Sequence, residues 1–309
     1  MSHPAYAYLD DRVVPWDEAR VHVSSVAFKF GTAVFEGIRG YWSPEHEEMF
    51  LFRLDDHLER LRFSQAFMRF EAPIEPAVVR RAILEVVRAN ALREDVHIMA
   101  TVYVRGPGGP AVSGPVGLAV TAAPRLDIPW GETGCRVQVS SWQRVEDRAM
   151  PVRVKCNANY QNGRLAAVQA RADGYDTALL LNARGKIAEG PGMCFFMVRD
   201  GRALTSTVTS DILESITRAT LLELIPTACG IPCVERDLDR SELAAASEAF
   251  FCGTAWEVTP IVAIDGLPVG AGVPGPVVRA LRAAYFDLVR GASAAHPEWR
   301  TPVYGEEAS

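Results

Sequence analysis

Two kinds of periodicity alternate along this chain, and they constrain its fold more than any other feature of the sequence. In short segments such as residues 97–104 and 117–122, apolar residues recur as they do in β-strands. In longer segments such as 76–90 and 276–289, apolar residues recur at the spacing of an amphipathic helix. We therefore expect a mixed α/β protein with strands and helices interleaved along the chain.

The periodic pattern lapses between residues 124 and 134, where proline, aspartate, tryptophan and glycine are concentrated. The length of 309 residues suits two ordinary domains. We expect a small α/β domain over residues 1–123, a connecting loop over 124–135 and a larger α/β domain over 136–309.

The composition excludes several classes of protein. Hydrophobic residues make up 49% of the chain and charged residues 23%, which excludes a disordered chain, a collagen and a coiled coil. The formal net charge of −6 argues against a nucleic-acid-binding surface. No apolar stretch approaches the ~18–20 residues of a membrane helix, and the first residues lack the pattern of a signal peptide. A cytoplasmic protein without a membrane or nucleic-acid partner is expected.

The six cysteines do not form the pattern of a disulfide framework. Cys229 and Cys233 lie close together in the sequence, but no second pair of ligands follows them at the spacing of a zinc site. We expect buried, reduced thiols and no metal site.

Lysine is scarce, because the 32 basic residues comprise three lysines and 29 arginines. Any chemistry that needs a lysine must therefore use Lys29, Lys155 or Lys186. Lys155 ends segment 152–155, which alternates like a strand, and a polar loop follows it. A lysine at the end of a strand can be partly desolvated and attack carbonyl groups, or it can be an ordinary surface residue.

Three further polar segments each admit a functional and an ordinary interpretation. Glu189 precedes a glycine-rich turn and an apolar strand, so its carboxylate is either held toward a cleft or part of a simple turn. Ser215, Ile216 and Thr217 open a helix, where free N–H groups can bind a phosphate or the serine can be a plain N-cap. Residues 253–255 follow a buried strand and could place a hydroxyl and N–H groups on the same anion.

Taken in order, these segments resemble the class IV (fold-type IV) pyridoxal-phosphate aminotransferases, most closely the branched-chain amino acid aminotransferases. The resemblance extends from about Tyr8 to Phe286, and its most specific stretch is residues 21–39, which ends in Glu-Gly-Ile-Arg. It implies an α/β (α+β) enzyme with a small N-terminal α/β domain and a larger C-terminal α/β pseudo-barrel domain. It also implies pyridoxal 5'-phosphate as cofactor and a homodimer or higher homo-oligomer whose active sites use residues of the neighbouring subunit.

The resemblance assigns a role to each matched residue at the cofactor. Lys155 matches the lysine that binds the cofactor as a Schiff base and then transfers protons as general base and acid. Glu189 matches the carboxylate that keeps the pyridine nitrogen protonated, and Tyr160 matches the residue that hydrogen-bonds the ring's phenolic oxygen. The residues expected to bind the phosphate are Arg60, Ile216, Thr217 and Thr254.

Three substrate-binding positions depart from the usual branched-chain pattern. Phe30, His97 and Met99 stand where these enzymes usually have tyrosine, tyrosine and arginine. Because the usual groups bind substrate carboxylates, loss of the charged donor should weaken glutamate, and we expect a larger, aromatic or non-standard amino substrate. The expected substrate-binding residues are Phe30, Phe35, Gly37, Arg39, His97, Met99, Gly192, Thr254 and Ala255.

Other departures surround the same site. Cys194 stands where these enzymes usually have asparagine, and residues 213–215 replace the usual Leu-Pro-Gly while leaving the N–H donors of the helix start in place. Arg39, Arg105 or Arg125 could supply a replacement for the missing charge at the substrate.

The expected activity is that of a transaminase acting through Lys155. It would move an amino group between an L-amino acid, branched-chain-like or otherwise hydrophobic or non-standard, and a 2-oxo acid. A D-amino acid or (R)-amine aminotransferase and an aminodeoxychorismate lyase would share Lys155 and Glu189, although the Glu-Gly-Ile-Arg motif favours the branched-chain group. A non-catalytic α/β binding protein is the alternative from another class.

Overall fold

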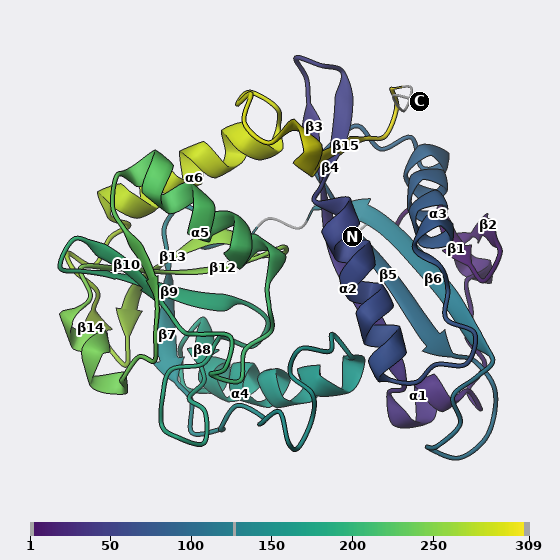
Figure 1. Cartoon of the computed structure of the whole chain (residues 1–309), viewed down its shortest axis with the longest axis horizontal. Helices are drawn as coiled ribbons and strands as arrows, with labels where there is room; N and C mark the ends of the chain where they lie inside the picture. The colour runs from purple at the N-terminus through teal and green to yellow at the C-terminus, as the bar shows by residue number, and fades with distance from the viewer. Residues whose placement is uncertain (1–2, 126–127, 306–309) are drawn as a thin grey trace. The chain divides into compact units, whose positions relative to one another are not determined.

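The computed structural model describes residues 3–125 and 128–305, and the chain divides into two compact units. Each unit contains one β-sheet and its own helices, which Figure 1 shows coloured by residue number. Unit 1 comprises Met1–Leu126, Val154–Ala158 and Asp287–Ser309, and unit 2 comprises Asp127–Arg153 and Asn159–Phe286.

This division differs from the expected domains in two places. Residues 154–158, which carry Lys155, and the C-terminal residues 287–309 belong to unit 1, although the sequence pattern alone predicts both in the second domain. The first difference arises because the backbone around Lys155 hydrogen-bonds to a strand of unit 1. The second arises because the last strand of the chain pairs with the sheet of unit 1.

Unit 1 is built on a seven-stranded sheet in the order β15-β4-β3-β5-β6-β1-β2. All neighbouring strands are antiparallel, and β3, β5 and β6 form its long central part. The strands expected within residues 97–104 and 117–122 are present. Their bounds are β1 Tyr6–Leu9, β2 Arg12–Pro15, β3 Ala33–Ser43, β4 Glu48–Phe52, β5 Val96–Val104, β6 Val116–Pro124 and β15 Arg300–Pro302.

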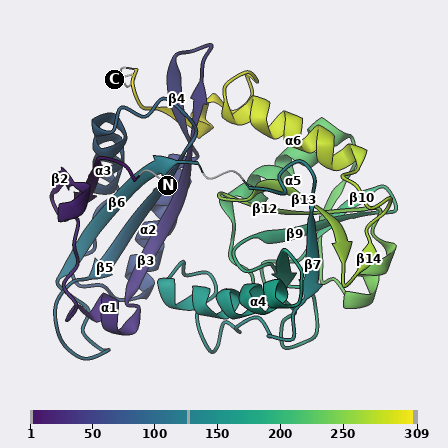
Figure 2. The same cartoon turned by 180° about the vertical axis from the view of Figure 1, so that it is seen from behind.

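Two helices cover one face of this sheet, as the opposite views in Figures 1 and 2 show. Helix α2, Leu54–Phe67, packs on β3, and helix α3, Pro76–Ala89, packs on β6. The apolar stripe predicted for the second helix is buried, as its periodicity requires. The shorter helical segments are η1 Trp16–Glu18, α1 Val26–Phe30 and η4 Pro297–Trp299.

The two faces of the central strands have different surroundings. In β5, residues Val96, Ile98 and Ala100 are buried, whereas the alternating residues His97 and Met99 are half-buried. This alternation follows from strand geometry, in which successive side chains point to opposite faces. His97 and Met99 therefore belong to the face opposite the helices.

Unit 2 contains an eight-stranded mixed sheet in the order β11-β10-β9-β12-β13-β7-β8, with β14 paired to β13. Its core includes a stacked pair, Phe196 on β9 and Phe250 on β12, with ring centroids 5.1 Å apart. The bounds are β7 Cys135–Val139, β8 Thr177–Leu179, β9 Cys194–Arg199, β10 Arg202–Thr205, β11 Cys233–Glu235, β12 Glu248–Gly253, β13 Glu257–Ile264 and β14 Leu267–Pro268.

The helices of unit 2 pack on its sheet. Helix α4, Tyr160–Ala172, packs on β8, and helix α5, Ile216–Cys229, packs on β12 and β11. Helix α6, Pro276–Val289, begins in unit 2, and its last residues belong to unit 1. The remaining helical segments are η2 Asn157–Asn159 and η3 Arg240–Ala245.

Segment 152–155 is not the strand that its alternation predicts. Val152 and Val154 are both buried, but the backbone around them forms turns. The alternation therefore reflects two buried valines in an irregular segment, since burial of every second residue does not require a strand ladder. Lys155 follows directly, and its neighbour Cys156 forms an isolated bridge with Val34 of β3.

A buried glutamate fastens the C-terminal segment to unit 1. The Glu48 carboxylate accepts hydrogen bonds from the backbone N–H groups of Met49 at 2.8 Å, Val303 at 3.0 Å and Tyr304 at 2.8 Å. The Arg88 guanidinium donates to the carbonyl of Val303 at 2.7 Å. These bonds explain why the end of the chain belongs to unit 1 rather than to the unit that precedes it.

Candidate active site

The expected site residues fall into two groups, one in each unit, and each group is described by itself. The group in unit 1 consists of Phe30, Phe35, Gly37, Arg39, Arg60, His97, Met99 and Lys155. The group in unit 2 consists of Tyr160, Glu189, Gly192, Ile216, Thr217, Thr254 and Ala255.

Lys155 is held through its backbone by two elements of unit 1. Its carbonyl accepts a hydrogen bond from the Phe35 N–H at 3.0 Å, and its own N–H donates to Ser64 Oγ of α2 at 3.3 Å. The Nζ atom lies 4.8 Å from the centroid of the Phe35 ring, within the range of a cation–π contact. The lysine that could act as a nucleophile therefore has a fixed backbone and a half-buried side chain.

Arg60 pairs with the buried carboxylate of Glu36, a residue of the Glu-Gly-Ile-Arg motif for which the sequence predicted no role at the site. Its Nε donates to Glu36 Oε1 and its Nη2 to Glu36 Oε2, both at 2.7 Å. Glu36 Oε2 also accepts a hydrogen bond from His57 Nδ1 at 2.7 Å. Only 1% of the Glu36 residue is exposed, so this carboxylate depends on these three bonds for its solvation.

Burial and charge act in opposite directions on this group. Burial alone would raise the pKa of Glu36, but the charge and hydrogen bonds of Arg60, together with His57, lower it to about 2. Burial lowers the pKa of His57, and the neighbouring Glu36 offsets only part of this effect. Glu36 is therefore charged near neutral pH, and the neutral form of His57 is favoured.

The expected substrate residues of β3 and β5 share the sheet face opposite the helices. In the register of β3 and β5, Gly37 lies across from Met99 and Arg39 lies across from His97. A Cβ atom on Gly37 would stand 2.9 Å from His97 Cε1, so glycine is needed for the imidazole to lie there. Among the described residues, His97 Nδ1 is buried without a hydrogen-bond partner.

His97 is uncharged at neutral pH. Burial, followed by the charges of Arg39, Lys155 and His57, lowers its pKa to about 4. Phe30, by contrast, lies on α1 and is 46% exposed. The structure thus groups His97 with Gly37, Arg39 and Met99 in one part of unit 1, whereas the Phe30 side chain is solvent-accessible.

In unit 2, Glu189 is the centre of a second buried ion pair. Its Oε1 lies 2.8 Å from Nη2 of Arg144, and both of its carboxylate oxygens accept from the Leu213 N–H at 3.3 Å. The Cys194 thiol donates to Oε2 at 3.8 Å, which is a weak hydrogen bond. Only 4% of Glu189 is exposed. This residue is a positioned carboxylate and not a simple turn residue.

Arg144 is the main residue of this site that the sequence analysis missed. Its Nε donates to the Asp211 carbonyl at 3.1 Å, and its backbone N–H donates to the Leu181 carbonyl at 2.8 Å. The side chain is therefore fixed at both ends and buried next to Glu189. No local pattern could have indicated it, since its partner lies on a distant part of the chain.

The start of α5 is capped by a serine. Ser215 is the N-cap, and its Oγ accepts a hydrogen bond from the Arg218 N–H at 3.2 Å. Helix geometry leaves the N–H groups of the first turn, including those of Ile216 and Thr217, without acceptors inside the helix. The Leu213 N–H bonds to Glu189, so this helix start and the buried carboxylate are linked within three residues of chain.

The remaining expected site residues of unit 2 lie close to one another around two glycines. A Cβ atom on Gly192 would lie 3.5 Å from Tyr160 Cε1, and one on Gly253 would lie 3.4 Å from the Gly192 carbonyl oxygen. Tyr160, the turn after Glu189 and the end of β12 are thus neighbours. Thr254 and Ala255 follow directly after this end of β12.

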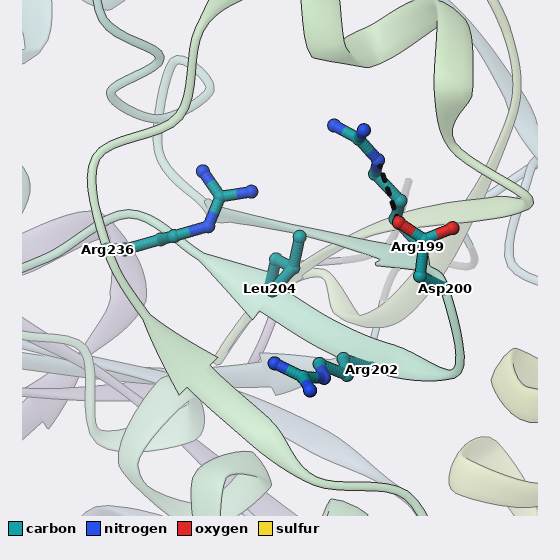
Figure 3. Close-up of a pocket in the computed structure, with 5 residues that line it drawn as sticks. All are labelled: Arg199, Asp200, Arg202, Leu204 and Arg236. Carbon is teal, nitrogen blue, oxygen red and sulfur yellow. Dashed lines mark ion pairs between the residues drawn. The ribbon is translucent and has the colours of Figure 1, made fainter.

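A cavity of about 380 Å³ elsewhere in unit 2 contains none of the expected residues. Figure 3 shows its lining, in which three guanidinium groups surround Leu204. Glu242 binds both Arg199 and Arg236, so two of these charges are already paired. The lining residues are Arg199, Asp200, Arg202, Leu204 and Arg236.

Over residues 3–125 and 128–305, no group of three acidic, histidine or cysteine side chains could hold a metal ion. The same residues include no helix long and apolar enough to cross a membrane. All six cysteines are free thiols.

Comparison with known proteins decides the family. A sequence model described as amino-transferase class IV matches residues 33–264, which is most of the chain. The chain belongs to the class IV aminotransferase family. It is 36% identical to a probable branched-chain-amino-acid aminotransferase of Aquifex aeolicus, with 97% of each chain covered, and 38% identical to the branched-chain-amino-acid aminotransferase of Pseudomonas aeruginosa, with 96% of each covered.

The fold agrees with this assignment. The structure superposes on the pyridoxal-phosphate form of branched-chain amino acid aminotransferase from Thermobaculum terrenum with a TM-score of 0.92 and 41% identity, covering 98% of this chain and 99% of that one. The predicted family, fold class and transaminase activity are confirmed. The chain is a pyridoxal-phosphate-dependent aminotransferase, and these relatives favour that interpretation over the lyase and the non-catalytic protein.

The residues present fit this cofactor. Pyridoxal phosphate needs an amine for its aldehyde, a carboxylate for its ring nitrogen and donors for its phosphate. Unit 1 contains Lys155 and Arg60, and unit 2 contains the buried, cation-supported Glu189 and the N–H donors at the start of α5. The chemistry of this donor set matches every functional group of the cofactor.

Replacement of Arg144 should destabilise unit 2, because Glu189 would remain buried without its cation. We expect Arg144→Ala to lower the free energy of unfolding by about 3 kcal/mol, measured by urea denaturation. Arg148→Ala is the matched control, because this arginine follows on the same loop and its side chain is 92% exposed. The control should change stability by less than about 0.5 kcal/mol, and equal effects of the two variants would contradict the proposed support of Glu189.

Acidification should destabilise unit 1. His57 and His97 take up protons near pH 6.5 in the unfolded chain but only at lower pH in the fold, so stability is highest above pH 6.5 and falls below it. Glu36 adds a further loss between pH 4.5 and about 2. Urea denaturation at a series of pH values should show this slope. The loss of unfolding free energy on acidification should be about 1 kcal/mol smaller in His97→Gln than in the wild-type protein. An equal loss in the two proteins would contradict the low pKa of His97.

Proposed function

We propose that this enzyme transfers the amino group of a branched-chain or other apolar L-amino acid to a 2-oxo acid. The names of the relatives from Aquifex aeolicus and Pseudomonas aeruginosa support a branched-chain substrate. The observation that carries the proposal is the sheet face around Gly37, where the half-buried side chains of Met99 and His97 on β5 carry no charge and the Arg39 side chain beside them is buried. Such a face favours an apolar substrate side chain over a carboxylate.

Two of the three arginines considered as replacements for the missing charge have acidic neighbours. Arg105 Nη1 lies 3.1 Å from an oxygen of Asp10, and Arg125 Nη1 lies 4.0 Å from an oxygen of Asp95. Arg39 remains next to His97, but it is buried in the sheet. We therefore infer that a second substrate carboxylate gains little from these residues and that glutamate is a poor donor.

We assign the binding of the cofactor to the residues that the sequence predicts at it. Arg60, the N–H groups of Ile216 and Thr217, and the Thr254 hydroxyl would bind the phosphate. Glu189 would accept a hydrogen bond from the ring N–H, and Tyr160 would donate to the phenolic oxygen. Arg144 supports this assignment, because a cation beside Glu189 favours the charged carboxylate that can accept this bond.

Lys155 would bind the aldehyde carbon and act as the general base and acid of the reaction. The bound cofactor supplies a protonated ring that accepts the electrons left on the substrate when its α-carbon loses a proton. Once the substrate's amino group has displaced it from the aldehyde carbon, the Lys155 amine would take that proton and return it to this carbon of the cofactor. Its fixed backbone, bonded to Phe35 and Ser64, supports a role that needs one reproducible position.

The substrate assignment is tested with the purified enzyme and a panel of L- and D-amino acids. We expect L-leucine to convert the bound cofactor to pyridoxamine phosphate, visible in the absorbance spectrum, at least about tenfold more efficiently than L-glutamate. Met99→Arg should narrow this difference by restoring a charged donor. Equal use of the two amino acids by the wild-type enzyme would overturn the proposed specificity.

The role of Lys155 is tested by its replacement. Lys155→Ala should abolish turnover, and unchanged activity would overturn the role of the lysine.

We also propose that the enzyme is a homodimer or a higher homo-oligomer. Exposed apolar residues gather in and beside α1, where Phe28 is 71% exposed and Phe30 is 46% exposed. Large exposed apolar side chains mark interaction surfaces. A substrate-binding role for the exposed Phe30 is consistent with active sites that use residues of a neighbouring subunit.

Sedimentation velocity should give at least twice the mass of one chain. Phe28→Asp should shift the protein toward the monomer and lower its activity, because it places a charge in the apolar surface. Leu267→Asp is the matched control, since Leu267 is an exposed apolar residue of unit 2, and it should leave the mass unchanged. A fully active wild-type monomer would contradict the proposal.

We propose a cytoplasmic location for the enzyme. The six free thiols support a reducing compartment, because disulfides persist mainly in oxidising ones. The expected partners are its small-molecule substrates and other copies of the same chain.

A further inference from the structure

We propose that Glu36 is a positioning residue for phosphate recognition, because it orients the Arg60 guanidinium together with His57. This proposal rests on the phosphate-binding role proposed for Arg60. Glu36 itself would touch neither substrate nor cofactor, since both of its carboxylate oxygens are occupied by side chains of α2.

The first step of the argument is the orientation of the guanidinium plane. Two parallel hydrogen bonds from Nε and Nη2 to one carboxylate fix this plane, whereas a single bond would let it rotate. The bonded edge of Arg60 faces Glu36, so the remaining donor edges are directed away from it. A phosphate at those edges would meet a donor that needs no reorientation on binding.

The second step concerns the carboxylate. Glu36 lies within β3, and its side chain is removed from water, so its position is set by its partners and not by solvent. His57 and Arg60 lie one turn apart on α2, and the His57 Nδ1–H bond supplements the two bonds from Arg60. Three hydrogen bonds from side chains of α2 thus fix the position of the Glu36 carboxylate on the neighbouring strand.

The third step links this pair to Lys155. The N–H of Phe35 bonds to the Lys155 carbonyl, and the side chain of the next residue, Glu36, bonds to Arg60. One turn beyond Arg60, Ser64 of α2 accepts a hydrogen bond from the Lys155 N–H. Glu36 therefore keeps the Arg60 guanidinium at a fixed position relative to Lys155. Such a fixed position is needed if Lys155 is to bind the aldehyde and Arg60 the phosphate of the same molecule.

Two probes separate this role from general stability: pyridoxal phosphate, and pyridoxal, which lacks the phosphate. Their dissociation constants are measured by absorbance titration of full-length protein freed of cofactor. We expect Glu36→Gln to raise the dissociation constant of pyridoxal phosphate about tenfold and that of pyridoxal by less than about twofold. The difference is expected because only binding of the phosphate depends on the orientation of Arg60. Equal weakening of the two probes, or an unchanged preference, would overturn the proposal.

A double-mutant cycle identifies the residue through which Glu36 acts. Arg60→Lys keeps the charge but cannot form the two parallel bonds. In Arg60→Lys protein we expect Glu36→Gln to change the preference for pyridoxal phosphate over pyridoxal by less than about twofold. The reason is that the two parallel hydrogen bonds that Glu36→Gln would disturb are already absent. A full tenfold effect of Glu36→Gln on Arg60→Lys protein would show that Glu36 acts through another group and overturn the proposal.

Glu48→Gln is the matched control. Glu48 is another buried glutamate of unit 1, but it binds only backbone N–H groups of its own strand and the C-terminal segment. It should lower the thermal midpoint while leaving the preference for pyridoxal phosphate over pyridoxal unchanged. If Glu48→Gln lowered that preference as much as Glu36→Gln, a structural effect would replace the proposed role.

Should Glu36→Gln protein fail to fold, His57→Leu serves as the second variant, because it removes one of the three bonds and leaves the ion pair. We expect a loss of about threefold in the preference for pyridoxal phosphate. No loss would overturn the part assigned to His57. A wild-type protein that binds pyridoxal as tightly as pyridoxal phosphate would instead overturn the phosphate role of Arg60 on which the proposal rests.

Discussion

The hydrogen bonds of two consecutive residues of β3 determine how unit 1 is organised. Because successive side chains of a strand point to opposite faces, the side chains of Phe35 and Glu36 lie on opposite faces of the sheet. The Phe35 ring lies beneath the Lys155 amine, while the Glu36 carboxylate is buried against α2. A strand is well suited to this task, since its backbone is fixed by neighbours on both sides. The Lys155 backbone and the Arg60 guanidinium are therefore both hydrogen-bonded to a strand that has neighbours on both sides.

Unit 2 meets a similar physical problem in a similar way. A carboxylate away from water stays charged only if a cation or several donors compensate for the lost hydration. Glu189 has Arg144 for this purpose, just as Glu36 has Arg60, but the two pairs differ in geometry. The guanidinium of Arg60 meets both oxygens of its partner, whereas Arg144 meets one oxygen and also bonds to a backbone carbonyl. The first arrangement orients an arginine, and the second supports a carboxylate.

Much of the fold and part of the site could be predicted from the sequence. Periodicity located the helices that include Val79 and Val278, because a helix buried on one side must repeat its apolar residues. It failed at Val152 and Val154, where burial in a turn imitates the alternation of a strand. Motif order identified Lys155 and Glu189, since their surroundings are local in sequence. Arg144 and His57 were missed because their partners are distant in the chain, and no spacing rule connects residues that only the tertiary fold brings together.

The attachment of the C-terminal segment through Glu48 and β15 has a consequence for biosynthesis. The sheet of unit 1 is assembled from segments that are translated at very different times, and its edge strand β15 is made after every strand of unit 2. Until then β4 has an open edge, where unpaired backbone groups can attract other chains. Unit 2, whose sheet is complete by β14, can fold while unit 1 still waits for its final strand. In this enzyme a sheet that is begun before unit 2 is synthesised is thus completed only after it.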